Sequence, residues 1–224
     1  MKKKMFFNDW LDILLFKKKP ADIAKTSLGE GLKHLVIASV IVGILNGIYQ
    51  YLAIGQLAEL TGTSNLMMGF AGPLMIVATA IMTPIIAVIG IIIGGAILHL
   101  FCLILGGKGD IGNYIGVLAM ISAAIAGTAT AVITVIQILG TLAGAYLMMM
   151  MVAGLLALIV GLWQLVLVVL ATQAVQQLSL GRAIVAVIVI PLIIAVVLAA
   201  VMATVLFAFI ASMVPTGMGS LPMA

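Results

Sequence analysis

The sequence predicts an all-α integral membrane protein, a bundle of five transmembrane helices with its amino end inside and its carboxyl end outside. Hydrophobic residues make up 65% of the chain and charged residues 7%, against about 25% charged in an ordinary soluble domain. Beyond residue 33 the only charged side chains are Glu59, Lys108, Asp110 and Arg182, and the stretches between them are long and apolar. Basic residues near short loops stay in the cytoplasm, and five crossings place every Lys and Arg of this chain there.

Residues 1–33 form the predicted cytoplasmic segment, which carries eight Lys and four acidic residues. With about 100° between successive residues, the apolar side chains of residues 6–16 gather on one arc and Asn8, Asp9 and Asp12 lie opposite. This amphipathic helix is too short to cross about 30 Å of hydrocarbon, so we expect it to lie in the membrane interface, the alternative being a soluble helix docked on the bundle. The residues expected to meet lipid are Lys2, Lys3, Lys4, Phe7, Trp10, Leu11, Leu14, Lys17, Lys18 and Lys19.

Residues 34–224 form one membrane domain whose apolar runs predict five spans. The second run, Pro73 to Leu105, is longer than a perpendicular helix needs, so Pro84 predicts either a kink near Thr83 or an outer half that lies along the surface. The predicted spans are about 34–51, 80–105, 113–137, 147–172 and 183–212.

The distribution of charges between the two sides of the membrane tests this topology. Eight Lys of the amino-terminal segment, Lys108 and Arg182 fall inside, whereas the outside loops carry Glu59 alone. A four-span arrangement would bury one basic turn within a helix pair or leave one long apolar run unused. The net charge of +4 is concentrated beside the membrane, which favours anionic lipid headgroups over nucleic acid as the partner. The predicted location is the cell membrane, with multiple passes.

Small residues recur at four-residue spacing, which lets helices approach closely in lipid. Gly43 with Gly47, and Gly90 with Gly94, predict helix packing within the bundle, with a homodimer face as the alternative. Gly140 and Gly144 are typical of a turn between spans.

Polar residues within the spans are few. The candidates for a polar lining are Asn46, His99, Gln137 and Gln164, although such side chains more often bond to a neighbouring helix. Ionisable groups at membrane depth mark ion and proton paths, and their scarcity argues against a pump. Cys102 is the only cysteine, so no multi-thiolate metal site is expected, and the sequence predicts no metal and no cofactor.

Two turns carry a resemblance to a known family. The stretches LHLFCLILGGKGDIGNYIGVLA (98–119) and QLVLVVLATQAVQQLSLGRAIVAVIVIP (164–191) resemble the Yip family, multispan proteins named for interaction with Ypt/Rab GTPases, over about residues 14–211. The family-like turn positions are Gly106, Gly107, Lys108 and Gly109, then Ser179, Gly181 and Arg182. An Asp-Leu-Tyr-Gly-Pro-like motif of eukaryotic members is absent, so the resemblance implies a prokaryotic-type member with the family's fold.

These observations predict a non-enzymatic membrane scaffold that organises lipid or partner proteins, in a homo-oligomer or with other membrane proteins. The alternative is a transporter or channel for a small or apolar solute, suggested by Pro84, Pro191 and the amides within the spans. A membrane hydrolase would need a His, Asp or Glu placed to activate a nucleophile, and the sequence offers no such set.

Overall fold

The computed structural model describes residues 25–61 and 68–213, and within them every regular element is a helix. Five helical stretches are long and apolar enough to cross a membrane, which confirms the predicted number. They are Leu28–Gln56, Gly72–Ile104, Ile111–Leu142, Tyr146–Gln176 and Leu180–Phe209. The predicted interfacial helix at 6–16, with its flanking lysines, lies outside the described residues.

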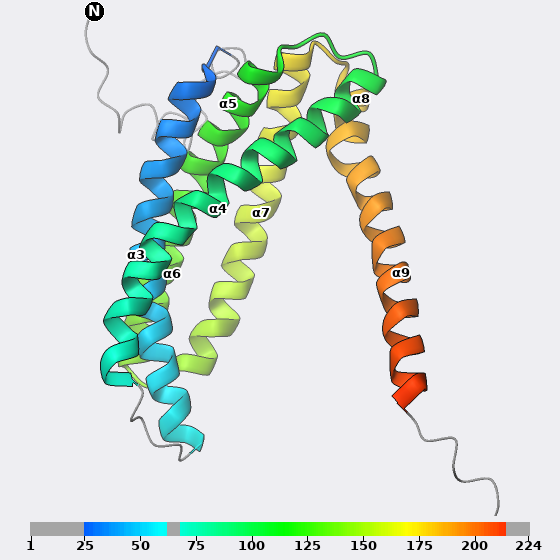
Figure 1. Ribbon diagram of the computed structural model, residues 1–224. Helices are drawn as coiled ribbons and strands as arrows, with labels where there is room; N and C mark the ends of the chain where they lie inside the picture. The colour runs from blue at the N-terminus through cyan, green and yellow to red at the C-terminus, as the bar shows by residue number, and fades with distance from the viewer. Residues whose placement is uncertain (1–24, 62–67, 214–224) are drawn as a thin grey trace, which may run out of the picture.

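The first two spans are carried by α3 (Leu28–Thr61) and α4 (Met68–Ile104), which pack together along much of their length. Both Pro73 and Pro84 lie inside α4, so one helix takes up the apolar run that is longer than a perpendicular span needs. Its 37 residues correspond to about 55 Å at 1.5 Å per residue. The oblique path of α4 across the bundle accommodates that length (Figure 1).

The third span forms the centre of the bundle and is not a uniform α-helix. It consists of α5 (Ile111–Ile121), a π-helical turn η1 (Ser122–Gly127) and α6 (Thr128–Leu142). All residues from Tyr114 to Ile121 are buried, and the core continues into Ala123, Ala124 and Ile125. Side chains of α3, α4 and the fourth span pack around this segment.

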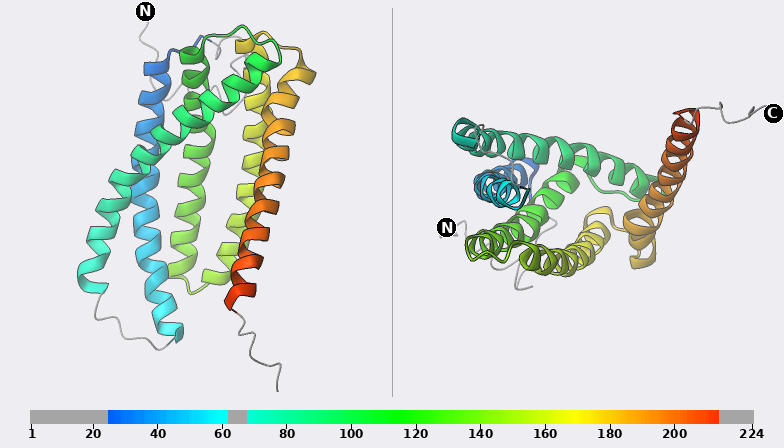
Figure 2. Two further views of the ribbon diagram at one scale, coloured as in Figure 1. Left: turned by 45° about the vertical axis from the view of Figure 1, so that its right-hand side comes forward. Right: turned by 90° about the horizontal axis from the view of Figure 1, so that it is seen from below.

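The fourth span is α7 (Tyr146–Gln176), and the fifth consists of α8 (Leu180–Ile184), a π turn η2 (Val185–Val189) and α9 (Ile190–Met213). The fifth span contacts the bundle through α8 and η2. Beyond them α9 stands apart from the other helices (Figures 1 and 2). Every residue from Leu192 to Phe209 is exposed.

The turns fall at two opposite ends of the bundle. The start of α3, the α4–α5 turn (residues 105–110) and the α7–α8 turn (177–179) lie together at one end, which we call the paired-turn end (Figure 1). The α6–α7 turn (143–145) lies at the other end, where α3 finishes. In that turn the N–H groups of Gly144 and Ala145 bond to the carbonyls of Thr141 and Gly140 at 3.0 and 2.8 Å, and Gly144 has φ +74°, a Schellman termination of α6.

Candidate functional site

The paired-turn end contains the most elaborate polar structure in the described part of the chain, and its first component is the end of α4. Gly106 has φ +89°, a conformation in which glycine is favoured. The N–H of Gly106 bonds to Leu103 O at 3.0 Å and that of Gly107 to Cys102 O at 2.7 Å. These two bonds form a Schellman motif that satisfies the last carbonyls of the helix, so the paired glycines terminate α4.

The second component is the turn between α7 and α8. Gln177 ends α7 in the left-handed conformation at φ 54°, which is uncommon for a residue other than glycine. Ser179 begins α8, and its hydroxyl accepts a hydrogen bond from Arg182 N at 3.5 Å. The Arg182 guanidinium in turn donates from Nη1 to Leu105 O at 3.3 Å. A cation at the carboxyl end of α4 also interacts favourably with the helix dipole.

Gln176 joins the two turns. Its backbone carbonyl accepts from Lys108 N at 3.0 Å, and its side-chain Oε1 accepts from Gly109 N at 3.2 Å. Its Nε2 lies 2.8 Å from His99 Nδ1. The side chain of Gln176 is completely buried, so these are bonds made away from water. We refer to this set of contacts as the Gln176 bridge.

The Gln176 bridge determines the tautomer of His99. A backbone N–H can only donate, so the contact with Gly109 requires Oε1 of Gln176 on that side and leaves its NH₂ group facing the imidazole. His99 Nδ1 must therefore accept, and the ring proton lies on Nε2. Both ends of the buried Gln176 amide therefore have a partner, Gly109 N–H at Oε1 and His99 Nδ1 at Nε2.

Tyr114 and Thr172 extend the polar contacts between α5 and α7. The two hydroxyl oxygens lie 2.9 Å apart, and Thr172 Oγ1 donates to Val168 O at 2.7 Å. Since the threonine proton is used in that bond, Tyr114 is the donor to Thr172. The rings of Tyr114 and His99 lie 6.1 Å apart between centroids. Together His99, Gln176, Tyr114 and Thr172 form the buried polar cluster.

The buried polar cluster is held together by hydrogen bonds and by the ring contact between His99 and Tyr114. No carboxylate takes part, since Asp110 caps α5 by accepting from Asn113 N at 2.8 Å and is itself exposed. Cys102 is free and fully buried. Among residues 25–61 and 68–213, no group of three or more His, Cys, Asp or Glu side chains could hold a metal ion. The cluster ties α4, α5 and α7 together at their ends.

The other predicted polar residues are spread over separate contacts. Asn46 Oδ1 on α3 accepts from Thr134 Oγ1 on α6 at 3.1 Å, and Gln164 Nε2 on α7 donates to Ser122 Oγ on η1 at 3.4 Å. The backbone carbonyl of Gln137 accepts from Thr141 Oγ1 at 2.7 Å. The structure brings none of these amides to His99, so the four candidates do not form one lining.

The two glycine pairs differ in their surroundings. A Cβ at Gly43 would lie 2.6 Å from Thr79 O, and one at Gly47 would lie 2.7 Å from Ile76 Cα. This pair is therefore the place where α3 meets α4, so a homodimer face is not available there while the helices stay packed. A Cβ at Gly90 or Gly94 would meet nothing within 4 Å, so these two glycines are not needed for close approach between helices of this chain.

A cavity of about 310 Å³ lies beside the core and was not foreseen from the sequence. Its lining comes from α3, α4, η1 and α6 and is mostly apolar. Of the predicted site residues only Gly90 lines it. Gln176, Tyr114 and Thr172 were likewise missed as site residues. The polar run Gln173, Gln176 and Gln177 at the end of an apolar span was the one signal that pointed to Gln176.

Comparison with family models, with curated proteins and with solved structures finds no match. The predicted lipid-binding residues of the amino-terminal segment lie outside the described part of the chain. Of the family-like turns, the structure brings Lys108 and Gly109 against Gln176 and Arg182 against Leu105, so the two turns that carry the resemblance contact each other.

Proposed function

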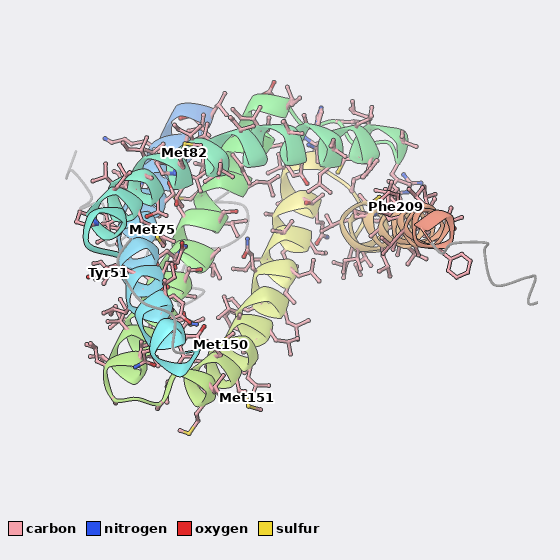
Figure 3. All side chains as sticks on the ribbon, turned by 60° about the horizontal axis from the view of Figure 1, so that its bottom comes forward. Tyr51, Met75, Met82, Met150, Met151 and Phe209 are labelled. Carbon is pink, nitrogen blue, oxygen red and sulfur yellow. The ribbon has the colours of Figure 1, made fainter. Side chains whose placement is uncertain are left out.

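We propose that this chain is a non-enzymatic membrane scaffold of Yip-like type, which works by lateral association with lipid or with partner proteins. The observation that carries the proposal is the position of α9. Apart from Thr204, residues 192–209 of this helix are apolar, and they are exposed around its full circumference. Figure 3, drawn with the described side chains, shows them radiating around α9 without reaching α7.

The surface of α9 is suited to packing with another helix. Apolar surface gives no driving force between helices in lipid, and association depends instead on close packing at small residues. Ala195, Ala199 and Ala203 recur at four-residue spacing on α9, and all three are exposed. We propose that this alanine face receives a helix of a second chain or of another membrane protein.

The other features of the proposal are the topology and the location. Five spans with the paired-turn end in the cytoplasm place Lys108 and Arg182 inside, in agreement with the distribution of basic residues. The amino-terminal lysines would then lie against anionic headgroups of the cell membrane. The contact between the two family-like turns supports the Yip-like assignment, because both turns then belong to one structural unit.

A second function, transport of a small apolar solute, is favoured by the cavity beside the core. The amides within the spans support it less, since Asn46 and Gln164 are bonded to neighbouring helices. In sealed liposomes the purified scaffold is expected to pass no ions, sugars or amino acids faster than empty liposomes. Saturable flux that is lost in Asn46→Leu would replace the scaffold with the transporter.

The scaffold is tested by site-specific crosslinking in native membranes. A photoreactive amino acid at Ala199 is expected to capture a protein partner, either a second copy or one defined membrane protein. The matched control places the same residue at Val201, which is exposed about 200° around the same helix. Capture of lipid alone at both positions, or equal protein capture at both, would contradict association through the alanine face.

A further inference from the structure

The cavity beside the core lies between two places where glycines bring α4 close to a neighbouring helix. Near one of them Gly43 and Gly47 bring α3 against residues 76–80 of α4. At the other, a Cβ on Gly95 would lie 2.9 Å from Ile115 Cγ1 of α5. Between these contacts the stretch that contains Thr83, Ala87 and Gly90 lines open space of about 310 Å³.

The cavity lies at the depth of the hydrocarbon. Ser39 lines it from α3, which begins at Leu28. Counted from His34, where the predicted first span begins, five residues at 1.5 Å each place Ser39 about 8 Å along the helix, within a hydrocarbon core about 30 Å thick. A ligand of this cavity is therefore drawn from the interior of the bilayer.

Both long walls of the cavity have irregular backbone. Pro84 has no N–H, so the carbonyl of Ala80 lacks its usual partner within α4. The facing wall includes Ser122 and Gly127 of the π turn η1. Single π turns within α-helices occur frequently at functional sites, and irregular backbone at membrane depth is tolerated where it lines a cavity.

Two hydroxyl groups in the lining set it apart from an ordinary packing defect. Several hydroxyls in the described spans donate to the carbonyl four residues earlier, at 2.7 to 2.8 Å; they belong to Ser39, which also lines the cavity, and to Thr79, Thr141, Thr172 and Thr204. Outside the lining, Thr128 Oγ1 is buried and has no hydrogen-bond partner within the described residues. Thr83 and Thr130 line the cavity and make no such bond within the described residues. Each therefore keeps a donor for a molecule in the cavity.

We propose that this cavity binds a neutral lipid that carries a hydrogen-bonding oxygen within its apolar body. The ligand is neutral because no charged side chain lines the cavity and an uncompensated charge at this depth is costly. It is mainly apolar because most of the lining is apolar, and the volume lies at the lower end of the range for small-molecule sites, about 300–1,000 Å³. Its oxygen accepts from Thr83 and Thr130. No residue of α9 lines the cavity, so the inference does not depend on the proposed association.

The test uses photoaffinity labelling of the full chain in vesicles. One probe is a C16 ketone with its carbonyl and a diazirine near mid-chain, and the second is the same diazirine hydrocarbon without the carbonyl. Adducts located by mass spectrometry are expected on the cavity lining, with saturation by unlabelled ketone. The ketone is expected to label these residues roughly fivefold more than the hydrocarbon, in line with one to two hydrogen bonds. A phosphatidylcholine with a diazirine in one acyl chain serves as the comparison for bulk lipid.

Four variants make the test specific. Gly90→Leu places a side chain into the cavity and is expected to reduce labelling at least tenfold, whereas Gly94→Leu lies one turn along α4, away from the lining, and is expected to leave labelling unchanged. Thr83→Val and Thr130→Val preserve shape and break no bond of the chain, and each is expected to bring the two probes closer to equal labelling. Equal labelling by both probes in the unmodified protein would overturn the proposed hydrogen bonds from Thr83 and Thr130 to the oxygen of the ligand. Labelling that does not saturate and is insensitive to Gly90→Leu would show bulk lipid only and would overturn the site.

Discussion

At the residue scale, Gln176 combines complete burial with bonds to two other elements. Its side chain accepts from Gly109 and donates to His99, and its own carbonyl accepts from Lys108. Removing a partner from a buried polar group costs more than a hydrogen bond contributes, because the remaining group stays out of water without a partner. The free energy that depends on Gln176 is therefore expected to exceed that of any exposed amide in the chain.

Gln176→Ala is predicted to lower the free energy of unfolding by about 2–4 kcal/mol, since Gly109 N–H and His99 Nδ1 both lose a buried partner. The measurement is denaturant unfolding in mixed micelles followed by circular dichroism. Gln173→Ala is the control, because Gln173 lies one turn earlier on α7, is half-buried and makes no hydrogen bond within the described residues. Equal effects of the two substitutions would show that the Gln176 bridge contributes little.

The pair Tyr114 and Thr172 gives an asymmetric prediction. Thr172→Val leaves the fully buried Tyr114 hydroxyl without its acceptor on α7, at a cost of about 1–3 kcal/mol. Tyr114→Phe removes the donor, while Thr172 keeps its bond to Val168 O. Thr172→Val is therefore expected to destabilise the protein more than Tyr114→Phe, as measured by the same unfolding assay. The reverse order would contradict the assigned direction of the bond.

At the element scale, the glycines of α3 and α4 differ in whether close contact between helices requires them. Ala at Gly43 would place its Cβ 2.6 Å from Thr79 O and 3.0 Å from Ala80 Cα, both backbone atoms that cannot move without separating α3 from α4. A Cβ on Gly94, in contrast, meets only open space. Substitution by Ala therefore tests the contact between α3 and α4 at position 43 and helix propensity at position 94.

Gly43→Ala is predicted to cost about 1–3 kcal/mol of stability through overpacking, whereas Gly94→Ala is predicted to be neutral or stabilising by up to about 1 kcal/mol. Thermal unfolding in detergent, compared with the unmodified protein, distinguishes the two. Similar losses in both variants would mean that helix backbone rigidity, not the contact between α3 and α4, governs these positions.

The helices were largely predictable, and their irregularities were not. Long apolar runs separated by charged turns or, between the third and fourth spans, by an uncharged glycine-containing turn predicted the number of spans, because burying charge in hydrocarbon is costly whatever the neighbouring helices are. The continuous α4 through Pro73 and Pro84 did not follow from the sequence, since neighbouring helices at membrane depth compensate for prolines that would break a helix in water. The cavity and the π turn η1 depend on how α4 crosses the bundle, which hydropathy does not encode.

At the scale of the whole molecule, the ends of the helices form two groups. The start of α3 and both family-like turns lie at the paired-turn end, and the α6–α7 turn lies opposite (Figure 2). Charge predicts which group faces the cytoplasm, because Lys108 and Arg182 both lie at the paired-turn end.

The separation of α9 from the bundle, in contrast, could not be predicted from the sequence. A helix that is apolar on all sides has the same sequence pattern whether lipid or protein surrounds it.

Single cysteines on a Cys102→Ser background are predicted to report this orientation in intact cells. An impermeant thiol reagent is expected to label Gly144→Cys and to leave Lys108→Cys and Ser179→Cys unlabelled until the membrane is permeabilised. All three positions are exposed in the structure, so a lack of labelling reflects the side of the membrane and not burial. Labelling at position 108 before permeabilisation would contradict the topology.

The isolation of α9 also affects how this chain tolerates sequence change. In the bundle, an unfavourable substitution reduces packing within the chain, so loss of function and loss of folding are difficult to separate. Residues 192–208 lack that constraint because they are exposed around the whole helix, and any apolar side chain there satisfies the bilayer equally well. In a saturation-mutagenesis screen, apolar substitutions that fail within α9 would therefore identify contacts made with other molecules, and their positions would trace that interface on an otherwise permissive helix.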